Sequence, residues 1–126
     1  NINEVWDILH RLLKDDGMLF IAVPNSESAD AEHYGEYWAA YDVPRHLWHF
    51  TPDTMKAFGE KHKFEMIDML PMPFDAFYVS MLSEKYKGEK LSFLGGGLRG
   101  ALCGIEATNN KTKSSSITYI FKKKNE

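Results

Sequence analysis

The segment that decides the fold prediction is Met18-Leu19-Phe20-Ile21-Ala22-Val23-Pro24. Six successive apolar residues without alternation are typical of a strand buried on both faces, as in a parallel sheet, and Pro24 ends the run. Gly17 precedes the segment and supplies the left-handed stop at which helices commonly end. Because residues 2–13 carry apolar side chains at helical spacing, the sequence predicts a helix, a glycine turn and an interior strand, which together form an α/β unit.

The rest of the chain predicts further elements of one α/β domain over residues 1–126. A helix is expected from Thr51 to about His62, because Thr51 can cap it, Pro52 suits its first turn and Asp53 faces its positive end. The other predicted elements are helices at 31–39, 74–86 and 91–105, strands at 64–70 and 117–122, and a polar loop at 108–116.

Composition restricts the classes of partner and compartment. The net charge of −3 among 126 residues gives no reason to expect a nucleic-acid partner, since such proteins usually carry a strongly basic face. No apolar run approaches the roughly 20 residues needed to span a bilayer, so no membrane span is predicted. The one cysteine, Cys103, cannot form an intrachain disulfide, which fits a reducing compartment and leads us to expect a cytoplasmic protein.

Residues 25–50 form a long segment without a regular pattern. Unstructured loops longer than about 12–15 residues are uncommon unless they are functional or disordered. Disorder is not expected here, because disordered segments are poor in aromatic residues. The segment is therefore expected to be ordered and to cover another part of the protein. Its aromatic side chains are Tyr34, Tyr37, Trp38, Tyr41, Trp48 and Phe50.

Two stretches resemble a known family. The first is Leu13-Lys14-Asp15-Asp16-Gly17-Met18-Leu19-Phe20-Ile21-Ala22-Val23-Pro24-Asn25. The second is Pro44-Arg45-His46-Leu47-Trp48-His49-Phe50-Thr51-Pro52-Asp53-Thr54. They are similar to the glycine turn before the fifth strand and to a Pro-Arg-His element before the next helix in class I S-adenosylmethionine-dependent methyltransferases, in the group that includes ubiquinone-type O-methyltransferases.

The resemblance implies a fold and a reaction. The family has a doubly wound, Rossmann-like sheet, in which 18–23, 64–70 and 117–122 would be strands five, six and seven, the last antiparallel. Its glycine-rich loop and acidic residue for S-adenosylmethionine would lie ahead of Asn1. We therefore expect the C-terminal half of a longer enzyme that methylates a small molecule, with the fragment alone inactive and no residue of it assigned to the donor.

The resemblance also places residues 44–54 over the substrate pocket. His46 or His49 would then orient or deprotonate the acceptor, since histidine is suited to proton transfer near neutral pH, and Arg45 would hold an anionic group. The walls of the pocket would be Trp38, Tyr41 and Trp48.

Each of these residues also has a purely structural interpretation. His46 would instead bond a backbone carbonyl to fix the loop, and Trp48 would be part of the core. A zinc site is not predicted, because the only further histidine in the segment, His33, is distant in sequence.

Two other features bear on function. Gly95-Gly96-Gly97-Leu98-Arg99-Gly100 matches the dinucleotide pattern G-x-G-x-x-G, but it lacks the following acidic residue, so a flexible glycine turn is predicted instead. A second hypothesis is a non-catalytic binding or assembly module that self-associates through an exposed sheet edge.

Overall fold

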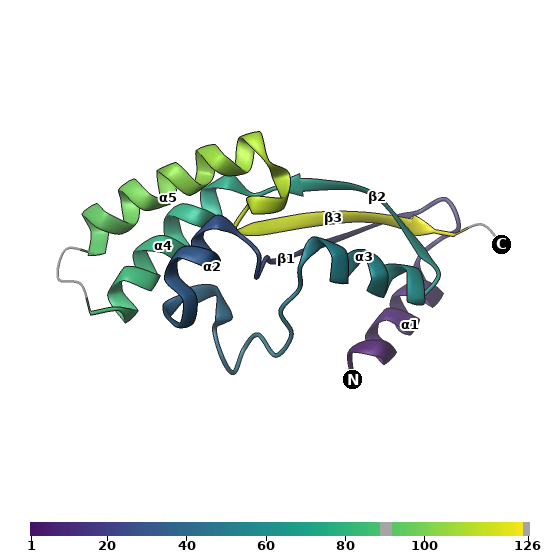
Figure 1. Ribbon diagram of the computed structural model, residues 1–126. Helices are drawn as coiled ribbons and strands as arrows, with labels where there is room; N and C mark the ends of the chain where they lie inside the picture. The colour runs from purple at the N-terminus through teal and green to yellow at the C-terminus, as the bar shows by residue number, and fades with distance from the viewer. Residues whose placement is uncertain (89–91, 125–126) are drawn as a thin grey trace.

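The computed structural model describes residues 1–88 and 92–124. Within them the chain forms a mixed α/β structure around a three-stranded sheet (Figure 1). Its elements are α1 (Ile2–Leu12), β1 (Met18–Pro24), α2 (Ala29–Tyr34), η1 (Gly35–Tyr37), η2 (Ala39–Tyr41), α3 (Pro52–Lys61), β2 (Phe64–Pro71), α4 (Pro73–Tyr86), α5 (Ser92–Asn109), η3 (Lys111–Lys113) and β3 (Ser116–Lys123).

The strands lie in the order β1-β3-β2, and β3 is antiparallel to both neighbours. The three strands were predicted within one or two residues of their ends, and the antiparallel direction of the last strand is confirmed. Because β1 and β2 both oppose β3, they run in the same direction and their carboxyl ends lie at the same edge of the sheet (Figure 1). Tyr119, in the middle of β3, pairs with Ile21 on one side and Met69 on the other.

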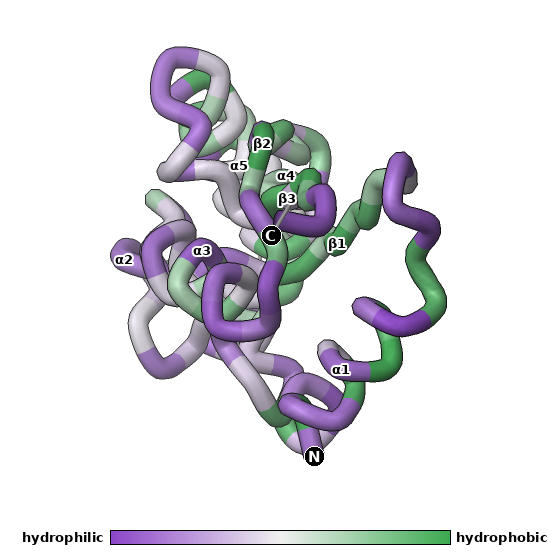
Figure 2. The backbone as a smooth tube through the Cα atoms, turned by 90° about the vertical axis from the view of Figure 1, so that its right-hand side faces the viewer, coloured by the Kyte–Doolittle hydropathy of each residue, from purple (hydrophilic) through white to green (hydrophobic). Residues whose placement is uncertain are grey.

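The core lies between one face of the sheet and the two helices α1 and α3. Trp6 of α1 is its centre, with the rings of Phe58, Phe64 and Phe121 around it at centroid distances of 5.4–5.6 Å. Figure 2 shows that the three strands coincide with hydrophobic stretches of the chain. The buried members of the core are Trp6, Met55, Phe64, Ile117, Tyr119 and Phe121.

Helix α3 begins where the sequence predicted it. The Thr51 hydroxyl accepts a hydrogen bond from the backbone N–H of Thr54 at 3.2 Å, and the backbone N–H of Thr51 donates to the Thr54 hydroxyl at 2.8 Å. Two backbone donors of the first turn are thus satisfied reciprocally, as in a capping box. Pro52 occupies the first turn, where its missing N–H costs no hydrogen bond.

The prediction that β1 is buried on both faces is wrong. Leu19, Ile21 and Val23 pack against the core, whereas Met18 and Phe20 on the opposite face are 58% and 56% exposed. No helix of the described residues covers that face, and β1 is an edge strand of the sheet. The unbroken apolar run therefore reflects one packed face and one exposed apolar face.

Helices α4 and α5 form a hairpin at the end of the sheet where β1 and β2 finish (Figure 1). The second helix was predicted at 91–105; the structure confirms it from Ser92 and extends it to Asn109, while residue 91 lies outside the described residues. The predicted glycine turn at 95–100 is wrong, since these glycines are helical. A Cβ atom on Gly96 would lie 2.5 Å from Met81 Cα, so the glycines allow the two helices to approach.

The predicted helix at 31–39 is replaced by α2 and two short 3-10 turns. Helix α2 ends at Gly35, whose φ of +53° lies in the left-handed region that favours glycine. Among the described residues, no helix combines the length and hydropathy needed to cross a bilayer.

Candidate functional site

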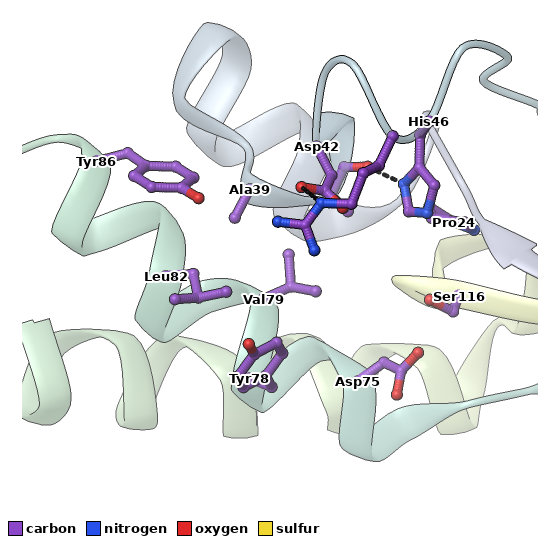
Figure 3. A pocket seen from close by; sticks show the side chains of 12 residues that line it. Pro24, Ala39, Asp42, His46, Asp75, Tyr78, Val79, Leu82, Tyr86 and Ser116 are labelled. Atoms are coloured by element: carbon purple, nitrogen blue, oxygen red, sulfur yellow. Dashed lines mark hydrogen bonds and ion pairs between the residues drawn. The ribbon is translucent and has the colours of Figure 1, made fainter.

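A pocket of about 390 Å³ opens at the edge of the sheet where β1 and β2 end (Figure 3). Pro24, the last residue of β1, and Ser116, the first of β3, form its sheet side. Two of the residues that the sequence predicts to be functional, Arg45 and His46, line this pocket. We call this cavity the strand-end pocket and take it as the candidate site.

One face of α4 forms the floor of the strand-end pocket. Pro73 begins α4 two residues after β2 ends, and this places the first turn of the helix at the strand ends. The residues of α4 that face the pocket recur at intervals of three and four, so they share one side of the helix (Figure 3). They are Asp75, Tyr78, Val79, Leu82 and Tyr86.

The opposite wall is the turn from Ala39 to His46, which is held by a buried anchor. The Trp38 side chain is 2% exposed, and its indole N–H donates to the Asp30 carboxylate at 2.8 Å. The Ser115 hydroxyl donates to the same carboxylate oxygen at 2.7 Å, and the Ala39 N–H donates to the Ser83 hydroxyl at 2.8 Å. The turn is therefore tied to α2, to α4 and to the segment before β3.

Tyr34 adds a further tie between α2 and α4, close to this anchor. Its hydroxyl donates to the Glu84 carboxylate at 3.0 Å. Burial, together with this hydrogen bond, raises the pKa of Tyr34 above its ordinary value. The hydroxyl therefore stays protonated and remains a donor throughout the physiological range.

His46 lines the strand-end pocket beside Pro24 (Figure 3). Its Nδ1 lies 3.0 Å from the carbonyl oxygen of Ala40. A carbonyl only accepts hydrogen bonds, so Nδ1 carries the proton and Nε2 of the neutral ring carries a lone pair. The bond to a backbone carbonyl that the structural interpretation of His46 predicts is therefore found. The same bond fixes the tautomer that a general base requires.

The charged groups of the strand-end pocket are Arg45, Asp42 and Asp75. The Arg45 Nε atom lies 3.4 Å from an oxygen of Asp42, but the Arg45 side chain is 83% exposed, and such surface ion pairs contribute little. Among the described residues, none forms a hydrogen bond or ion pair with the Asp75 side chain. The formal charge of the lining, with His46 neutral, is −1, from two carboxylates and one guanidinium.

The other predicted site residues lie outside the strand-end pocket. Trp38 and Tyr41 line a neighbouring pocket of about 740 Å³, which shares Ala39, Asp42 and Tyr86 with the strand-end pocket. His49 contacts the Tyr41 carbonyl through Nε2 at 3.0 Å, and Trp48 is 60% exposed. Neither His49 nor Trp48 lines either of these two pockets, so the structure brings together only His46 and Arg45 of the six predicted residues.

The sequence analysis missed five polar residues of the strand-end pocket. None of them was assigned a role in a site: Asp42, Asp75, Tyr78, Tyr86 and Ser116. The sequence did contain a signal for the α4 residues, because they recur at helical spacing and so share one helix face that carries polar groups. These residues are Asp75, Tyr78, Leu82 and Tyr86. Only the position of α4 beside the strand ends shows that this face borders a pocket.

Two features that would mark a cofactor or metal site are absent from the described residues. The glycines that match the dinucleotide pattern pack within α5 against α4, and no glycine-rich loop follows β1, β2 or β3. The same residues contain no cluster of three side chains able to hold a metal ion. Burial raises the pKa of the Cys103 thiol, which disfavours its reactive thiolate form.

The strand-end pocket combines one histidine of fixed tautomer with two carboxylates, two tyrosines and an apolar floor. Comparisons with known proteins leave the family open, since no family model, curated protein or solved structure matches this chain.

Proposed function

We propose that this chain supplies the acceptor side of an S-adenosylmethionine-dependent methyltransferase that acts on a small molecule. The observation that carries the proposal is His46: it belongs to the stretch that resembles the family, it lines the strand-end pocket, and the contact of its Nδ1 with the Ala40 carbonyl leaves Nε2 able to accept a proton. The antiparallel pairing of β3 with β1 supports the proposal, because the resemblance implies an antiparallel last strand.

The residues of the strand-end pocket have distinct roles in this proposal. The resemblance implies that S-adenosylmethionine supplies the methyl group. An acceptor hydroxyl loses its proton as its oxygen is methylated, and His46 Nε2 takes that proton. Val79 and Leu82 exclude water from one side of the acceptor, while the buried anchor of Trp38 on Asp30 holds His46 in place through the turn. Positioning of this kind is the main requirement for methyl transfer.

The test uses the longest protein that contains this sequence, because the described residues form no donor site. Calorimetry should detect S-adenosylmethionine binding, and a methyl-transfer assay with a panel of hydroxylated acceptors should detect activity. His46→Gln should lower turnover by about 100-fold or more, in the range typical for loss of a general base, with donor binding unchanged.

His49→Gln is the matched control, since His49 also contacts a backbone carbonyl but does not line the strand-end pocket. This variant should retain turnover within about threefold, well inside the effect expected for a lost base. Absence of donor binding by the longest protein rules the proposal out. Equal effects of the two substitutions would rule out the role of His46.

A second candidate function is strand-mediated assembly, which the exposed apolar surface around β1 favours. The edge of β1 opposite β3 has no strand partner among the described residues, and an unpaired edge is a template for another strand. The exposed apolar side chains on β1 and α1 are Val5, Ile8, Leu12, Met18 and Phe20. Sedimentation velocity tests this function: self-association that Phe20→Lys abolishes supports it, and a monomer at all concentrations removes it.

A further inference from the structure

We infer that the acceptor held by the strand-end pocket is an uncharged ring compound with several hydroxyl groups, a cyclic polyol or a sugar. The inference rests on the proposed function, because it names the substrate class of the same pocket. The observations behind it are the charges, the unpartnered polar groups and the shape of the lining.

The charges of the pocket disfavour an anionic acceptor. Asp42 and Asp75 outnumber the single cation, Arg45. Arg45 is also paired with Asp42 at 3.4 Å and is 83% exposed, so water screens its charge. A carboxylate or phosphate entering this pocket would meet a net negative lining. The sequence-based assignment of Arg45 to an anionic substrate group therefore fits the structure less well than an uncharged substrate.

The acceptor groups of the pocket require hydrogen-bond donors on the ligand. The Asp75 carboxylate has no hydrogen-bond partner among the described residues, and an ionised carboxylate only accepts hydrogen bonds. Two hydroxyl groups on adjacent carbons can donate to its two oxygens. In Figure 3, Asp42 and Asp75 come from opposite walls of the pocket, with His46 near the sheet side. A ligand that satisfies all three residues carries hydroxyl groups on more than one side.

The shape and apolar part of the lining suit a single ring. The volume of about 390 Å³ lies at the lower end of the range for small-molecule sites. Val79 and Leu82 form an apolar floor, and Tyr78 and Tyr86 stand at either side of it (Figure 3). Aromatic rings offer both a flat surface for the C–H face of a saturated ring and a phenolic group for its hydroxyls. A long apolar tail would find only these few apolar groups.

The test is a ligand titration of the full 126-residue chain, without any methyl donor, followed by NMR signals of the His46 and tyrosine rings. The probes are myo-inositol and methyl α-D-glucopyranoside, and the anionic comparison is 3,4-dihydroxybenzoate. We expect at least one polyol to shift these signals saturably and to bind at least tenfold more tightly than the benzoate. Tighter binding of the benzoate, or no saturable shift with either polyol, overturns the inference.

Three substitutions assign the binding to the carboxylates. Asp75→Asn and Asp42→Asn should each weaken polyol binding by about tenfold, as expected for loss of a charged hydrogen bond. Asparagine tolerates the positive φ of +40° at residue 42, so this variant keeps the fold even if the other does not. Asp53→Asn on α3 is the matched control and should bind as the unaltered chain does. Unchanged polyol binding by a folded Asp75→Asn or Asp42→Asn variant overturns the inference.

The two proposals fail in different assays. Lack of S-adenosylmethionine binding by the longest protein removes methyl transfer but leaves the polyol titration standing. Tighter benzoate binding removes the polyol class while methyl transfer stands.

Discussion

Replacing single glycines of α5 by alanine should separate two effects on the free energy of unfolding, that of close helix packing and that of helix propensity. A Cβ atom on Gly96 would lie 2.5 Å from Met81 Cα and 2.8 Å from Met81 N, and one on Gly100 would lie 2.5 Å from Phe77 Cα. On Gly95 the nearest atom would be Glu84 Cδ at 3.8 Å, an ordinary contact. The three positions lie in one helix, so their intrinsic propensities are the same.

The expected magnitudes follow from these distances. Non-bonded carbon atoms rest at about 3.5–4.0 Å, so Gly96→Ala or Gly100→Ala must push the two helix backbones apart by about 1 Å. Overpacking of this kind costs about 1–3 kcal/mol, and the better helix propensity of alanine offsets about 0.5–1 kcal/mol of it. We expect a net loss of about 1–2 kcal/mol at these two positions, against a gain of about 0.5–1 kcal/mol for Gly95→Ala.

Urea unfolding followed by circular dichroism measures these differences. The two variants should differ in stability by about 1.5–3 kcal/mol, so with a slope of about 1–3 kcal/mol/M the midpoints of Gly95→Ala and Gly96→Ala should differ by about 0.5–3 M. Equal urea midpoints for Gly96→Ala and Gly95→Ala would refute this prediction, because they would show that the close approach of α4 does not limit the side chain at residue 96.

Three further predictions concern buried polar groups. Tyr119→Phe should raise the free energy of unfolding by about 1 kcal/mol in urea melts, because the buried Tyr119 hydroxyl has no partner among the described residues; destabilisation would show an interaction that the structure lacks. Burial raises the pKa of Tyr119, so the folded state binds the phenol proton more tightly than the unfolded state does. The resulting contribution to the free energy of unfolding should be complete below the ordinary pKa of about 10 and be lost as the pH rises further. Urea midpoints measured from about pH 9 to about pH 11.5 should therefore fall less steeply in Tyr119→Phe than in the unaltered chain. Asn25→Ala should cost about 2–4 kcal/mol, because the buried Asn25 amide donates to the Thr112 and Ser114 carbonyls at 2.7 and 3.0 Å; Asn109→Ala, at an exposed position, should stay within about 0.5 kcal/mol of the unaltered chain.

Most of the secondary structure was predictable because its signals are local. Thr51, Pro52 and Thr54 lie within four residues and fix the start of α3 by direct contacts. The segments predicted as strands are apolar or alternating runs that end at proline or at a turn, and all three form strands. Predictions failed where distant contacts decide the outcome, as for β1, whose burial on one face depends on which segments cover the sheet.

The candidate site was predicted only in part. Arg45 and His46 line the strand-end pocket, but Trp48 and His49, their neighbours in sequence, do not. The rest of the lining includes Asp75, Tyr78 and Tyr86 from α4. These residues lie 29–40 positions further along the chain. Sequence proximity therefore did not translate into a shared pocket, because a turn aims successive side chains in different directions.

By itself the sequence determined which segments form helices and strands and that the last strand is amphipathic. It did so because propensity, capping and apolar periodicity act over a few residues. Only the tertiary structure decided the strand order β1-β3-β2, the one-sided burial of β1 and the union of His46 with the α4 carboxylate and tyrosines. These features depend on contacts such as that of Asn25 with Ser114, 89 positions apart, whose pairing no local pattern encodes.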